Sequence, residues 1–130
     1  MFVLQTIKLI NLLIVYITNM EVNLIKNIKI ILDSANTIYN TRDYTSSTIL
    51  YFKALFLILD YILLIKEGKT PKDHNERFRL LQTSFPELYD ILDKIFPIYR
   101  TTYSLTIEKI KCDLVIKNVK QIIERYKIPI

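Results

Sequence analysis

Apolar residues recur at helical spacing along most of the chain, and this pattern predicts helices rather than strands. Residues 43–67 are apolar on nearly all sides, which is typical of the central helix of a bundle. Two flanking segments carry a single apolar stripe each: Val22, Ile25, Ile28, Leu32, Ala35 and Tyr39 in the first, and Cys112, Val115, Val119, Ile122 and Tyr126 in the second. The pattern therefore predicts an all-α protein, an up-and-down bundle of about five helices in a single domain.

Capping residues, prolines and the single glycine mark where these helices begin and end. Gly68 and Pro71 stop the central helix, and Pro97 predicts a kink or an end in a later one. Three capping-box patterns predict helix starts: Thr18 with Glu21, Asp73 with Glu76, and Ser84 with Glu87. The predicted helices cover about residues 21–39, 43–67, 73–81 and 86–99, with a last one from 104 or 106 to 127.

The first 19 residues form an apolar extension ahead of the predicted bundle, which covers residues 20–130. The extension lacks the basic start and cleavage site of a secretory signal and is short for a membrane span of about 20 residues. We expect an extra helix that packs on the bundle, then a translation start upstream of the true one at Met20, and a membrane anchor last. A second apolar run, 48–65, contains Lys53 and Asp60, which favours a soluble core helix.

The counts of reactive residue types exclude several chemistries. One histidine excludes two-histidine metal sites, and one glycine excludes a glycine-rich phosphate loop. The single cysteine, Cys112, lies at helical spacing among apolar residues, so we expect a buried, inert thiol in a reducing, cytoplasmic environment. The sequence therefore predicts no metal site, no cofactor and no catalytic residue.

One basic segment, residues 66–79, is the candidate for a phosphate or nucleic-acid contact. The chain has a net charge of +5, and this segment holds a concentration of its cations around a predicted helix start. The candidate binding residues are Lys69, Lys72, His74, Arg77, Arg79 and, further along, Arg100. The alternative is a solvated charged loop, because acids are interleaved with the bases and the histidine can serve in packing or capping.

Several short motifs follow one another in an order that resembles the HEPN superfamily in a compact archaeal form. They are Thr41-Arg42-Asp43-Tyr44, Tyr51-Phe52-Lys53-Ala54-Leu55, Leu59-Asp60-Tyr61, Gly68-Lys69-Thr70-Pro71-Lys72-Asp73-His74, and Phe96-Pro97-Ile98-Tyr99-Arg100-Thr101-Thr102-Tyr103. The match extends over about residues 20–126. It implies a helical bundle that forms a homodimer through its second and third helices. It also implies a nucleotidyltransferase or toxin–antitoxin partner.

Many HEPN proteins are ribonucleases that use an arginine followed four to six residues later by a histidine. No arginine stands at that distance before His74, so the resemblance implies a non-catalytic, dimeric binding module for RNA, a nucleotide or a partner protein, with no membrane contact. The alternatives are a divergent, metal-independent ribonuclease that uses His74 with Arg77 or Arg100, and an antitoxin-like interaction subunit.

The predicted central helix also suggests how two copies would pair. Lys53 and Asp60 are seven residues apart, so they lie on nearly the same helix face about 10 Å apart. In a two-fold antiparallel contact centred between Phe56 and Leu57, Lys53 of one copy would meet Asp60 of the other. The alternative is that each charge finds a local partner or reaches the surface.

Overall fold

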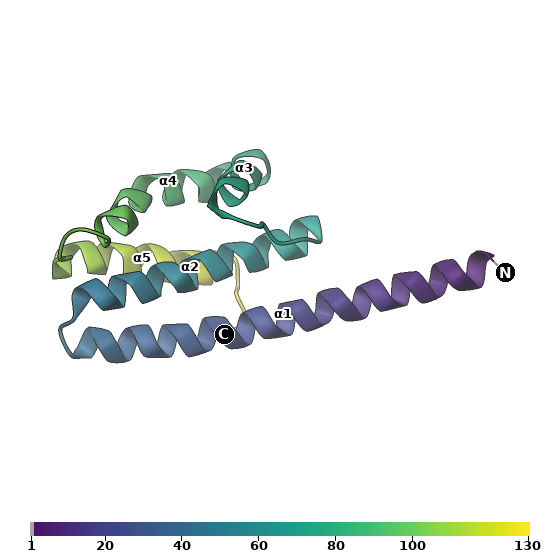
Figure 1. Cartoon of the computed structure of the whole chain (residues 1–130), viewed down its shortest axis with the longest axis horizontal. Coiled ribbons are helices and arrows are strands. Elements are labelled where there is room, and N and C mark those ends of the chain that lie inside the picture. Colours follow the sequence, from purple (N-terminus) through teal and green to yellow (C-terminus); the bar gives the residue numbers. More distant parts are fainter. Residues whose placement is uncertain (1) are drawn as a thin grey trace.

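The computed structural model describes residues 2–130, and over this range the chain forms five α-helices and no strand. The helices are α1 (Phe2–Asn40), α2 (Tyr44–Glu67), α3 (His74–Ser84), α4 (Pro86–Thr101) and α5 (Lys109–Arg125). Helices α1 and α2 run antiparallel side by side, α5 packs along α2, and α3 and α4 cover the opposite side of α2 (Figure 1). The predicted all-α bundle of about five helices is confirmed.

Helix α1 corrects the predicted boundary at Thr18. It continues without interruption from Phe2 to Asn40, because no glycine or proline lies in this stretch to stop it. Its N-terminal part projects beyond the end of α2 as a free arm (Figure 1). The expected packing of the extension on the bundle does not occur, since the side chains of residues 2–16 are all exposed.

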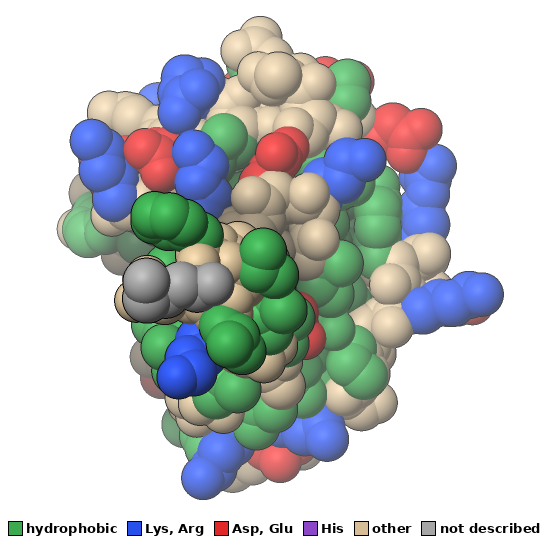
Figure 2. Space-filling model, turned by 90° about the vertical axis from the view of Figure 1, so that its right-hand side faces the viewer, with side chains coloured by type: hydrophobic (Ala, Val, Ile, Leu, Met, Phe, Trp, Pro, Cys, Tyr) green, Lys and Arg blue, Asp and Glu red, His purple; other side chains and the backbone are tan. Residues whose placement is uncertain are grey.

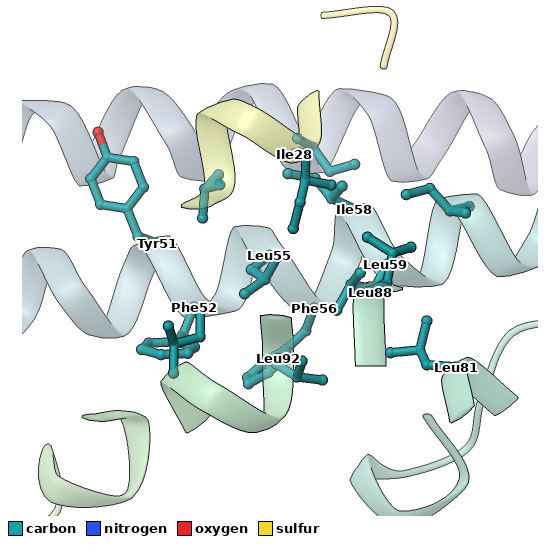
Figure 3. Close-up of a cluster of buried hydrophobic side chains, with 14 of the residues drawn as sticks. Ile28, Tyr51, Phe52, Leu55, Phe56, Ile58, Leu59, Leu81, Leu88 and Leu92 are labelled. Atoms are coloured by element: carbon teal, nitrogen blue, oxygen red, sulfur yellow. The ribbon is translucent and has the colours of Figure 1, made fainter. Parts of the chain in front are cut away.

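Helix α2 is the centre of the core, as its all-round apolar pattern predicts. Its buried side chains point both toward α1 and toward α4, so both layers pack on the same helix (Figure 3). Ile28 of α1 and Leu92 of α4 meet this helix from its two sides. The predicted stripe of α5 is also buried at Cys112, Val115, Val119 and Ile122, whereas Val22 of the predicted α1 stripe is exposed.

Both ends of α2 are capped, and the C-terminal cap is the predicted Gly68. The Asp43 carboxylate accepts a hydrogen bond from the Ser46 backbone N–H at 3.0 Å and closes the first turn. At the other end Gly68 adopts φ +74°, and its N–H donates to the Leu64 carbonyl at 2.8 Å. A glycine is favoured at this position because a side chain is strained in the left-handed region.

The later helices depart from the predicted ends in three ways. Ser84 does not cap α4; its hydroxyl donates to Glu67 instead, and Phe85 precedes the helix without a side-chain cap. Pro97 does not end α4, which continues to Thr101. Helix α5 begins at Lys109, later than residue 104 or 106, because residues 102–108 form the turn that brings the chain back to α2.

Candidate functional site between α2, α3 and α4

A pocket of about 430 Å³ opens where the exposed side of α2 meets the start of α3 and the end of α4. It contains the chain's only histidine together with two acids, a lysine, a buried arginine and two aromatic rings. The lining residues are Ile49, Leu50, Lys53, Phe56, Leu57, Asp60, Asp73, His74, Arg77 and Tyr99. A concave site with a few polar groups on an apolar wall is the usual form of a ligand site.

A buried ion pair between Asp60 of α2 and Arg77 of α3 forms the floor of this pocket. Arg77 Nε donates to Asp60 Oδ1 at 2.7 Å, and Arg77 Nη2 donates to Asp60 Oδ2 at 3.0 Å. The two side chains are only 9% and 11% exposed. The pair is therefore bidentate and shielded from water, the geometry in which an arginine binds a carboxylate most strongly.

His74 extends this pair into a chain of three side chains. Arg77 Nη1 lies 2.7 Å from His74 Nδ1. A guanidinium N–H can only donate, so Nδ1 must be the acceptor and the ring proton must sit on Nε2. Burial lowers the pKa of His74 from its usual value, and the nearby Arg77 charge lowers it further. The imidazole is therefore neutral at pH 7, with its N–H donor as the only free polar group.

Aromatic rings hold the imidazole in place. The Phe56 ring meets His74 edge-on, with centroids 4.6 Å apart, and Phe96 and Tyr99 lie at 5.7 and 5.9 Å. The Tyr99 hydroxyl is 3.0 Å from the Tyr103 hydroxyl. This hydrogen bond, with partial burial, raises the pKa of Tyr99 above its usual value. Tyr99 is therefore neutral at physiological pH.

Lys53 supplies a cation at the pocket that forms no ion pair with the residues that the structure describes. Its side chain is exposed on α2, and no carboxylate in residues 2–130 forms an ion pair with it. The Asp60 carboxylate, which lies on the same face, is already paired with Arg77. Two donors therefore remain available in the pocket, the Lys53 ammonium and the His74 N–H, and the Asp73 carboxylate also lines it.

The start of α3 is occupied by the chain's own carboxylates. The Asp73 side chain accepts from the Glu76 N–H at 2.8 Å, and Glu76 accepts from the Lys72 N–H at 3.3 Å. These two acids take the place that an external anion would need at the helix N-terminus. The segment therefore behaves at this point as the capped, charged loop of the alternative interpretation.

The structure brings together residues that the sequence placed in two separate groups. His74 and Arg77 were predicted to bind phosphate, and Lys53, Phe56, Leu57 and Asp60 were predicted at a dimer interface, yet all six line one pocket. Lys69, Lys72 and Arg79 are exposed around α3, and Arg100 lies over the Phe96 ring at 5.7 Å, outside the pocket lining.

Two predicted roles need correction. Arg77 is not a surface cation, because its three nitrogens bind Asp60 and His74 inside the fold. Asp60 has this intrachain partner and is not left for Lys53 of a second copy. Phe56, predicted at the centre of the dimer contact, is only 5% exposed.

Tyr99 was missed as a site residue. The sequence signal for it was its place in the aromatic run before Arg100, which gives no direction for the ring. Ile49 and Leu50 were missed as well, because on an all-round apolar helix the sequence does not show which face stays open.

Comparison with known proteins gives no match: no family model fits the chain, and neither the curated proteins nor the solved structures contain a significant match. The HEPN resemblance therefore stays a prediction.

Proposed function

We propose that the protein is a non-catalytic, HEPN-like binding module that holds an acceptor-rich ligand, a nucleotide or the phosphates of RNA, in the pocket between α2, α3 and α4. The observation that supports this proposal is the Asp60–Arg77–His74 chain. In this chain of contacts Arg77 and His74 Nδ1 are bound to other side chains of the protein and are not available to a ligand. The Lys53 ammonium and the His74 N–H remain as donors beside aromatic rings.

The same contacts argue against the alternative of a ribonuclease that uses His74 with Arg77. A general base needs a free lone pair near pH 7, and a general acid needs a proton that it can release. The lone pair of His74 is taken up by Arg77, and its lowered pKa disfavours the imidazolium form. Arg100 lies over Phe96 rather than in the pocket lining.

A homodimer through α2 belongs to this proposal, as the resemblance implies, with the contact moved away from Phe56 and Asp60. Ile49, Leu50 and Leu57 form an exposed to half-buried apolar face around Lys53. These residues also line the pocket, so a second copy packed there would contribute to its wall. A nucleotidyltransferase or a toxin–antitoxin component remains the proposed partner class, and the cytoplasm the proposed location.

The test is binding and cleavage of a fluorescein-labelled oligoribonucleotide at low salt. We expect the unaltered protein to bind, and Lys53→Ala to weaken binding by about tenfold through loss of one charge-assisted contact. Lys117→Ala removes a lysine that is also exposed, lies on α5 and is outside the pocket lining, and this variant should bind normally. The labelled RNA should stay intact throughout.

Three results would count against the proposal. Absence of RNA binding at low salt would contradict the proposed ligand. An equal loss of affinity in Lys53→Ala and Lys117→Ala would show that the RNA does not bind specifically at the pocket. Cleavage that disappears in His74→Ala, with the helical content retained, would favour the ribonuclease.

A further inference from the structure

The N-terminal arm of α1 is the largest exposed apolar feature of the molecule. Helix α2 has 24 residues and runs back along α1 from the turn at residues 41–43, so it reaches only to about Ile17. The arm beyond that point is about 22 Å long. Figure 2, which views the molecule from the side of the arm tip, shows hydrophobic side chains gathered around the tip.

The apolar face of the arm continues the face by which α1 packs on the bundle. Spacings of four and three residues alternate along the whole helix and define one seam: Val3, Ile7, Ile10, Ile14, Ile17, Glu21, Leu24, Ile28, Ile31, Ala35 and Ile38. This is the heptad pattern of helices that pack side by side. From Ile17 to Ile38 every seam residue is buried or half-buried against the bundle.

In the arm the same seam is uncovered. Val3, Ile7, Ile10 and Ile14 are 72%, 48%, 51% and 56% exposed. The polar side chains of the arm, Gln5, Thr6, Lys8 and Asn11, all avoid the seam positions. A lipid-covered helix has no need to keep its apolar positions in phase with a protein-packing seam, whereas a helix that meets another helix does.

We propose that the arm pairs with the arm of a second copy in an antiparallel, two-fold coiled coil. The seam is self-complementary in this orientation, because position numbers that sum to 17 face each other: Val3 meets Ile14 and Ile7 meets Ile10, each twice. Every exposed seam residue then has an apolar partner across the axis.

The position of α2 fixes the orientation of this pair. A parallel second copy on the same seam would continue into the volume that α2 already fills beside residues 17–40. An antiparallel copy leads away from the bundle. The arm of the second copy would lie against residues 3–14 of the first, in line with the end of α2. Together, α2 and this second arm would cover the seam of α1 over its full length.

This pairing is independent of the proposed function and uses a surface separate from the face of α2. Two different two-fold contacts on one chain would join dimers into larger assemblies. The mass in solution therefore reports on the arm even where α2 also associates.

The test compares two lysine substitutions in the full chain by sedimentation equilibrium. Ile10→Lys places a charge in the seam. Leu12→Lys is the matched control, because Leu12 is an equally apolar, 66% exposed residue on the opposite side of the same arm. We expect Ile10→Lys to raise the dissociation constant of the arm contact at least about tenfold, since each pair would bury two lysines. Leu12→Lys should leave it unchanged.

Cysteine cross-linking in a Cys112→Ala background tests the register. Val3→Cys with Ile14→Cys in the same chain should form disulfide-linked dimers on oxidation, and neither substitution alone should, because identical residues are far apart in an antiparallel pair. Cross-linking by either single variant would overturn the orientation. An unchanged mass in Ile10→Lys would overturn the contact. If both lysine variants lost self-association equally, and the unaltered protein floated with anionic lipid vesicles, the arm would be assigned to a membrane instead.

Discussion

Removal of one member of the Asp60–Arg77 pair should destabilise the protein strongly. Both side chains are about one-tenth exposed, so Asp60→Asn leaves a buried guanidinium without its counter-charge. Breaking a buried pair in this way costs about 3–5 kcal/mol. For a domain of this size that loss corresponds to a fall in Tm of roughly 10–20 °C.

The double variant separates an uncompensated charge from a lost contact. Asp60→Leu with Arg77→Met removes both charges and keeps apolar volume, so it should cost much less than the sum of the two single changes. The four proteins of this cycle are the unaltered protein, Asp60→Leu, Arg77→Met and the double variant. Their urea unfolding, followed by circular dichroism, gives the free energy of interaction between the two side chains. A single variant that loses less than about 1 kcal/mol, or costs that simply add, would refute a shielded pair, because exposed pairs contribute at most about that much.

Three further predictions concern single positions. The folded-state pKa of His74 is lowered, so protonation of His74 favours the unfolded chain, and its contribution to stability should be present above pH 6.5 and fall as the pH drops below that value; urea midpoints of His74→Gln should fall less over the same range. Cys112, fully buried, should react with a thiol reagent only at the rate of unfolding, and fast labelling in native buffer would contradict its burial. Gly68→Ala should cost about 1–2 kcal/mol of unfolding free energy through its positive φ alone, since no atom lies within 4 Å of the added methyl group; an unchanged urea midpoint would contradict this strain.

The fold could be predicted because local signals and the core pattern agree. Gly68 and Asp73 act as the helix caps that their positions in the sequence indicate, and the central helix begins beside residue 43 as predicted. The all-round apolarity of α2 correctly predicts a central helix. The boundary at Thr18 failed because a capping box competes poorly with an uninterrupted helical segment on both sides.

The pocket was harder to predict because its contacts join distant segments. Asp60 and Arg77 are 17 residues apart on different helices, and only the cost of burying an acid on an apolar helix hinted that Asp60 needs a cation. The sequence offered Lys53 of a second copy as that cation, since both lie on one helix face. The choice of Arg77 depends on how α3 folds back over α2, which local patterns do not specify.

The most direct test of the account is the protonation state of His74. It is the only histidine in the chain, so a two-dimensional nitrogen–proton NMR spectrum of its ring reports one site without overlap. The contact with Arg77 predicts a neutral ring with the proton on Nε2 at pH 7 and a pKa below 6.5. Addition of a nucleotide should shift the His74 signals in the unaltered protein and shift them less in Lys53→Ala. A proton on Nδ1, or a pKa at or above 6.5, would contradict the Asp60–Arg77–His74 chain and the non-catalytic role inferred from it.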